Sequence, residues 1–189
     1  MLRSLVGSEM CIRDRRETLE VLSGGGPSDV VELTLLFANE MLDAVGIKPK
    51  VDPATALKNG MAMDVWRKMI AAQGGDNDAP LPVAKETMEV KATETGKLLT
   101  LDAMKVGVAA WRLGAGRQKQ GEVLQLGSGI EIHAKPGDLV TKDQTILTLH
   151  TDEVARFERA MDALAGGFLI GGKDDEVKRL PLVVERIEG

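Results

Sequence analysis

The sequence changes its hydrophobic periodicity once, and this change constrains the fold more than any single motif. Up to residue 73, apolar side chains recur at the three- and four-residue spacing of amphipathic helices. Residues 74–87 are rich in glycine, aspartate and proline, and from residue 88 short alternating runs typical of strands begin. The pattern predicts an α+β chain made of a helical segment (16–73), a linker (74–87) and a mixed domain (88–189).

Turn and capping residues divide the helical segment. Three glycines and a proline at residues 24–27 should end a short helix that starts at residue 16. The next helix should start at Ser28 or Asp29, where Asp29 and Glu32 have the spacing of a capping box, and should end at Gly46. Asp52 before Pro53 predicts another helix start, because proline is well tolerated at the first helical position.

A further helix should follow Asn59 and Gly60 and end at Gly74, with an apolar face toward a core. We interpret three methionines of this region as side chains that fill a hydrophobic core: Met61, Met63 and Met69.

In the second half we expect two helices, at residues 102–113 and at 152–165 with Val154 on its apolar face. The expected strands are 88–92, 96–101, 130–134, 145–150 and 182–187.

Composition excludes several classes of protein. Charged residues make up 28% of the 189 residues with a net charge of −5, so we expect no basic surface for nucleic acid. No apolar run approaches the roughly 20 residues that span a bilayer, so we expect no membrane partner and a cytoplasmic location. Cys11 is the single cysteine, which excludes an intrachain disulfide. Residues 1–15 have no clear period and resemble extraneous cloning sequence, the alternative being a genuine amphipathic leader.

Glycine clusters offer two candidate anion sites. Residues 24–26 could cradle a phosphate at a helix N-terminus, but they lack the lysine and hydroxyl of a P-loop, so a simple turn is the preferred interpretation. Residues 114–117 follow a predicted helix and are interpreted as a helix stop and tight turn.

Lys105 has two interpretations. Met104 and Lys105 resemble the Ala-Met-Lys-Met hairpin of biotin carriers, and residues 135–147 resemble the second hairpin of biotinyl and lipoyl domains. The spacing around Lys105 instead fits a helical face, which would not present the lysine at a hairpin tip. A helix, with a barrel-sandwich element at 135–147, is preferred, and a carrier module remains the alternative.

The two histidines, His133 and His150, both lie in expected strands. They could act as an acid and base or as ligands. Because neither has a neighbouring Cys, Asp or Glu in a known ligand spacing, we expect both to be structural.

Three segments in this order resemble thymidine and pyrimidine nucleoside phosphorylases: GGGPSDVVEL at 24–33, VWRKMIAAQGGD at 65–76 and GVAAWRLGAGR at 107–117. The resemblance implies that residues 16–73 are the helical tail of a large α/β domain. It also implies that residues 88–189 are the C-terminal α/β hammerhead domain. The implied reaction converts a pyrimidine nucleoside and phosphate to the base and a (deoxy)ribose 1-phosphate, in pyrimidine salvage and catabolism by a homodimer.

The resemblance also bears on the site residues. The family's Lys-x-Ser-Thr-Gly-Gly-Val-Gly phosphate loop does not occur in this sequence, so no catalytic or substrate-binding residue is assigned and the chain is expected to be inactive as a fragment. Phosphate is the implied co-substrate, with no organic cofactor. Glu17 matches a glutamate that helps some relatives to bind a monovalent cation such as potassium. Glu17 alone cannot make such a site, so in this chain a solvated helix carboxylate is the preferred interpretation.

Overall fold

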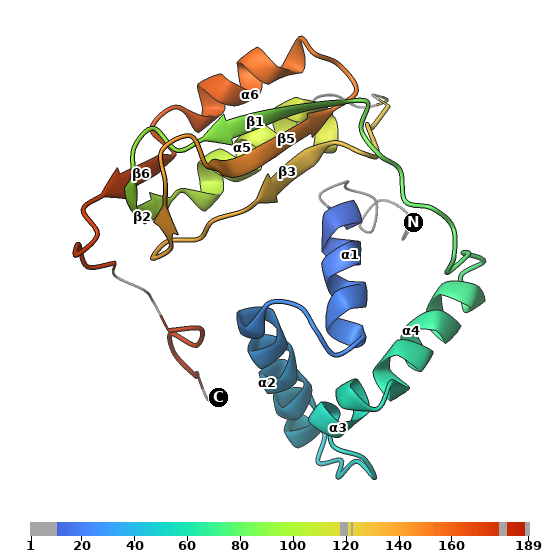
Figure 1. Cartoon of the computed structure of the whole chain (residues 1–189). Coiled ribbons are helices and arrows are strands. Elements are labelled where there is room, and N and C mark those ends of the chain that lie inside the picture. Colours follow the sequence, from blue (N-terminus) through green and yellow to red (C-terminus); the bar gives the residue numbers. More distant parts are fainter. Residues whose placement is uncertain (1–10, 118–120, 122, 178–180, 188–189) are drawn as a thin grey trace. The chain divides into compact units, whose positions relative to one another are not determined.

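A computed structural model describes residues 11–117, 121, 123–177 and 181–187 (Figure 1). The chain forms two compact units. The first, called here the helical unit, comprises Asp14–Pro80 and Leu180–Gly189. The second, the sheet unit, comprises Met1–Arg13 and Leu81–Arg179.

The helical unit is built from α1 (Cys11–Leu22), α2 (Ser28–Ala44), α3 (Pro53–Lys58) and α4 (Met61–Ala72) (Figure 1). Helix α1 begins upstream of residue 16, inside the stretch for which no period was found. Helices α1, α2 and α4 each end in a left-handed glycine, at Gly24, Gly46 and Gly74. At α1 the Gly24 N–H donates to the Val21 carbonyl (2.9 Å) and the Gly25 N–H to the Glu20 carbonyl (3.0 Å), which stops the helix.

Helix starts follow the predicted signals in one case and differ in another. The Asp52 carboxylate caps α3 by accepting the Thr55 N–H at 3.0 Å, with Pro53 in the first turn. Hydrogen bonding to Thr55 lowers the pKa of this exposed carboxyl, so the cap stabilises α3 above the usual aspartate pKa and is lost as the pH falls through the lowered value. Helix α2, in contrast, has Pro27 at its N-cap, so Asp29 lies within the first turn and not at the predicted capping position.

The apolar faces of α2 and α4 are open. No residue of either helix is buried, and the stripe on α2 includes Phe37 and Met41, which are 54% and 66% exposed. On α4 Met61 and Met69 are also exposed, so their interpretation as core filler is wrong. Among the described residues of this unit only Val21 is a buried hydrophobic residue. The helices therefore form through their local signals without a shared core.

The sheet unit contains two three-stranded antiparallel sheets. In one, β5 (Thr145–Thr151) lies between β1 (Glu86–Lys91) and β3 (Gly129–Ile132). In the other, β2 (Gly96–Leu101) lies between β4 (Leu139–Val140) and β6 (Phe168–Gly171). The mixture of helices and sheets agrees with the predicted α+β class.

The core of the chain lies in this unit. Helices α5 (Ala103–Ala110) and α6 (Arg156–Leu164) pack against each other beside the strands (Figure 1). Their buried side chains join those of the central strands, and the fully buried large residues include Leu98, Leu113, Ile146, Leu147 and Leu149. Burial of these aliphatic groups is the main favourable contribution to this unit's stability.

Three predictions for the second half need correction. Residues 182–187 form no strand, because they belong to the helical unit, whose described residues include no strand with which they could pair; the last strand of the sheet unit is β6 at residues 168–171. Helix α6 starts at Arg156 rather than at 152, and Val154 before it is exposed. Helix α5 ends at Ala110 and continues as a wider π-type turn, η2 (Trp111–Ala115), which closes at Gly114 with φ 111°.

The open faces predict fast hydrogen exchange in the helical unit. Helices without buried side chains open locally at low free energy, whereas the strands of the core open only with the whole unit. We expect amides in α2 and α4 to exchange at least about 100-fold faster than those of β1 and β5. This ratio corresponds to an opening free energy that is about 3 kcal/mol lower in the two helices. Hydrogen–deuterium exchange followed by mass spectrometry measures this, and slow exchange throughout residues 28–72 would contradict it.

Candidate functional site

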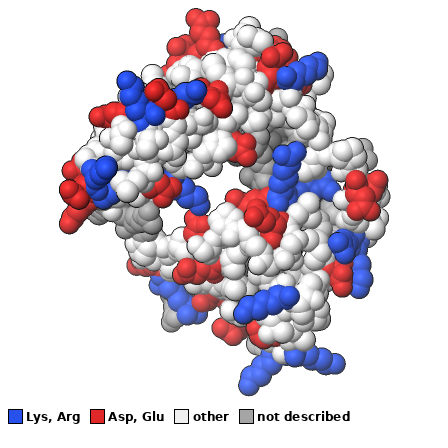
Figure 2. Space-filling model, viewed as in Figure 1, with Lys and Arg blue, Asp and Glu red and all other residues white. Residues whose placement is uncertain are grey.

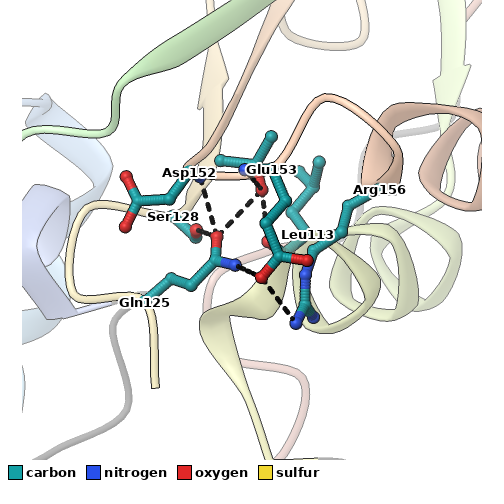
Figure 3. A network of polar contacts seen from close by, with 7 residues as sticks. Leu113, Gln125, Ser128, Asp152, Glu153 and Arg156 are labelled. Carbon is teal, nitrogen blue, oxygen red and sulfur yellow. Dashed lines mark hydrogen bonds and ion pairs between the residues drawn. The ribbon is translucent and has the colours of Figure 1, made fainter. Parts of the chain in front are cut away.

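Among the described residues of the sheet unit, the side-chain amide of Gln125 lies within hydrogen-bonding distance of four partners (Figure 3). Gln125 is buried in the loop before β3, and its Oε1 atom lies 2.8 Å from Ser128 Oγ, 2.9 Å from Thr151 Oγ1 and 2.8 Å from the Asp152 N–H. Its Nε2 atom donates to Glu153 Oε1 at 2.5 Å, and the same carboxylate accepts Arg156 Nη2 at 3.1 Å. We call these residues the Gln125 network.

Donor counting shows how the network is satisfied. The Thr151 hydroxyl has one proton and lies within reach of two acceptors, the Leu113 carbonyl at 2.8 Å and Gln125 Oε1 at 2.9 Å. Ser128 Oγ and the Asp152 N–H already donate to the Gln125 oxygen. The Thr151 proton therefore belongs to the Leu113 carbonyl in η2. The network thus joins the end of β5, η2 and the start of α6.

Two glycines allow the backbone to approach this network. A Cβ atom on Gly114 would lie 2.8 Å from the Gln125 side-chain carbon Cδ, and Gly114 also has a positive φ. A Cβ on Gly127 would lie 2.2 Å from the Ala84 backbone nitrogen. Through these close contacts the network holds three segments together: the loop before β3, the wide turn η2 and the residues before β1.

Lys105 lies in helix α5 and not at the tip of a hairpin. Its backbone N–H donates to the Asp102 carboxylate at 3.0 Å, which caps the helix, and its Nζ donates to the Ala165 carbonyl at 2.6 Å. The amine therefore closes the C-terminal end of α6. This confirms the helical interpretation of the residues around Lys105.

His150 lies in β5 as expected, whereas His133 directly follows β3 and is not in a strand, and the two histidines have separate partners. His133 Nε2 is 2.8 Å from Thr148 Oγ1, and His150 Nε2 is 3.7 Å from Glu131 Oε2. Each histidine thus bridges the β3 side and β5, which fits the structural role expected for both.

Glu17, the predicted cation ligand, is exposed on α1. Within the described ranges no group of three His, Cys, Asp or Glu side chains is arranged to hold a metal ion. The glycines at 24–26 end α1, with the Gly25 N–H turned back to the Glu20 carbonyl, which supports their interpretation as a turn. The structure therefore does not bring Glu17 and these glycines into one site.

Charges of both signs are interspersed over the face of the molecule in view in Figure 2. Across the residues that the structure describes, no helix is long and apolar enough to cross a membrane.

Sequence reasoning did not find the Gln125 network. Its members come from the loop before β3, the end of β5, the turn before α6 and α6 itself, so no short motif contains them. The available signal is a single glutamine between glycine-containing stretches, which has no specific meaning until the fold brings the partners together.

Loss of the Thr151 hydroxyl should destabilise the sheet unit. In Thr151→Val the buried Leu113 carbonyl loses its donor, and an unsatisfied buried group costs about 1–3 kcal/mol. The matched control is Thr148→Val, whose partner His133 is exposed and can bond to water, so we expect less than about 1 kcal/mol. Urea unfolding followed by Trp111 fluorescence in a Trp66→Phe background reports this unit, and equal losses for the two variants would contradict the assignment.

The position of Lys105 in a helix predicts that the chain carries no biotin or lipoate. The intact mass of the protein purified from cells with active biotin and lipoate ligases should match the unmodified chain of 20.3 kDa. An added mass that disappears in Lys105→Arg would show that the helix opens to expose this lysine.

Comparison with known proteins gives the family. Residues 98–171, which include α5, η2, most of the strands and α6, match the family model described as the pyrimidine nucleoside phosphorylase C-terminal domain. The chain is similar to thymidine phosphorylase from Mycobacterium tuberculosis, with 48% identity over 171 residues covering 90% of this chain and 39% of the relative.

Pyrimidine-nucleoside phosphorylases are also similar. The Staphylococcus epidermidis protein is 37% identical and the Bacillus subtilis protein 34% identical, each over 147 residues covering 72% of this chain and 34% of the relative. The chain thus spans between a third and two fifths of the length of these relatives. By these matches the chain belongs to the family of thymidine and pyrimidine-nucleoside phosphorylases and contains its C-terminal domain.

Proposed function

We propose that this chain is the C-terminal portion of a phosphorylase that converts a pyrimidine nucleoside and phosphate to the free base and a (deoxy)ribose 1-phosphate. The observation that carries the proposal is the 48% identity to a thymidine phosphorylase over 171 residues, a span that includes residues of both units. The enzyme would be a cytoplasmic pentosyltransferase of pyrimidine salvage and catabolism.

Within this proposal each part of the chain has an assigned place. Residues 16–73 are the tail of the large α/β domain, 74–87 the linker and 88–189 the hammerhead domain, while residues 1–15 are extraneous. The open apolar faces of α2 and α4 support the first assignment, because helices of this kind need further structure to cover them. The two antiparallel sheets flanked by α5 and α6 support a compact C-terminal domain.

The reaction's chemistry would come from residues outside this chain. Catalysis of phosphorolysis needs a cationic, amide-rich pocket for the phosphate dianion and donors for the charge that develops on the leaving base. The absence of the family's phosphate loop from the sequence supports the proposal that the chain alone is inactive. We place Glu17 as one oxygen ligand of a monovalent cation, potassium, in the homodimeric enzyme, since hard cations take oxygen ligands.

A chimeric enzyme tests the proposed function. The matching segment of the Mycobacterium tuberculosis thymidine phosphorylase is replaced by the aligned residues of this chain. If the two segments have the same role, kcat/KM for thymidine phosphorolysis should stay within about tenfold of the value for the parent enzyme. A tenfold change corresponds to about 1.4 kcal/mol of transition-state stabilisation. This chain by itself should release no thymine.

Two controls sharpen the experiment. Leu98→Asp in the chimera places a charge in the core and should abolish folding and activity together. Glu17→Gln should raise the potassium concentration needed for half-maximal activity, whereas Glu20→Gln, also exposed on α1, should not. A folded chimera without activity, or phosphorolysis by the isolated chain, would refute the proposed function.

A further inference from the structure

The linker between the units is attached at its upstream end to helix α4. The Gly75 N–H donates to the Ile70 carbonyl at 2.9 Å, and Asn77 Nδ2 donates to the Arg67 carbonyl at 3.1 Å. The carboxylate of Asp76 accepts the Asp78 N–H at 2.9 Å. These bonds make residues up to Asn77 follow the helix.

The downstream end is attached to the sheet unit. The Lys85 N–H donates to Asp152 Oδ1 at 3.1 Å, and Ala84 is buried. Gly127 holds the loop backbone directly against the linker, since an added Cβ would lie 2.5 Å from the Val83 carbonyl carbon and 2.2 Å from the Ala84 nitrogen. Residues 83–85 therefore behave as part of the sheet unit, although they precede its first strand.

This attachment continues into the Gln125 network. The Asp152 N–H donates to Gln125 Oε1 while the Asp152 carboxylate accepts from Lys85, so one residue connects the linker to the buried amide. Ser128, next to Gly127, donates its N–H to the Gln125 carbonyl at 3.0 Å. Both contacts of the linker are thus made by residues whose own positions the network fixes.

Between the two attached ends lie residues 78–82, with the sequence DAPLP. Within the described part of the chain no hydrogen bond holds residues 79–82. Pro80 and Pro82 have fixed φ angles and restrict the residues before them, so this short stretch bends at few positions. We infer that residues 78–82 are the hinge between the two units, and that the Gln125 network, through Asp152 and Gly127, is the anchor that stops the hinge at Val83.

Backbone ¹⁵N relaxation of the full chain tests the inference. Its readout is local to residues 79–85, so it does not depend on the other two crossings between the units, after Arg13 and after Arg179. Order parameters at Ala79 and Leu81 should be lower than those of the flanking residues and should return to about 0.85 at Val83, Ala84 and Lys85. In Asp152→Ala the values at Val83 and Ala84 should drop below about 0.6, because the hinge lengthens into them.

The matched control is Asp175→Ala, since Asp175 also accepts a backbone N–H, that of Gly172 at 2.8 Å, within the sheet unit but away from the linker. It should leave the values at residues 83–85 unchanged. Gly127→Ala is a second variant. Its added Cβ would clash with the backbone of Val83 and Ala84 and should detach these residues from the loop. Low order parameters at Val83 and Ala84 in the unaltered chain, or unchanged values there in Asp152→Ala, would overturn the inference.

Discussion

A buried side-chain amide must find partners for both its oxygen and its nitrogen, and much of the sheet unit is arranged around this requirement at Gln125. The oxygen accepts from Ser128 and the Asp152 backbone, and the nitrogen donates to Glu153. A buried network of this kind is rigid, because breaking one bond leaves several buried groups without partners. The wide turn after α5, the end of β5 and the linker therefore depend on one loop residue that belongs to no helix or strand.

The two units obtain their order in different ways. In the sheet unit, aliphatic side chains from both sheets and from α5 and α6 share one core, so tertiary contacts select the structure. In the helical unit the glycine stops and the Asp52 cap define where helices begin and end, but the apolar stripes have no described partner. Family membership offers an explanation for the open apolar faces. The relatives are more than twice as long as this chain, and their additional residues could cover such faces.

Local signals in the sequence were reliable where the physical cause is local. The Asp52–Pro53 start and the glycine stops after α1 and α4 need only neighbouring residues, and the helix at Lys105 follows from side-chain spacing. The strand expected at 182–187 was wrong, because an apolar pattern does not say which part of the chain a segment joins, and these residues belong to the helical unit, whose described residues include no strand. The Gln125 network was missed because the fold brings Gln125 next to Thr151, Asp152 and Glu153, which lie 26 to 28 residues away in the sequence. A family resemblance carried by three ordered segments was more informative about function than any candidate site residue.

Confinement of the core to the sheet unit has a thermodynamic consequence. Cooperative, all-or-none unfolding requires that the parts of a chain share buried contacts, and a unit with one described buried hydrophobic residue shares few. A single melting temperature or a single free energy of unfolding is then not a property of this chain. Each calorimetric or denaturant trace has to be assigned to a unit before two variants can be compared, and a substitution in α4 that leaves the main transition unmoved is not thereby neutral.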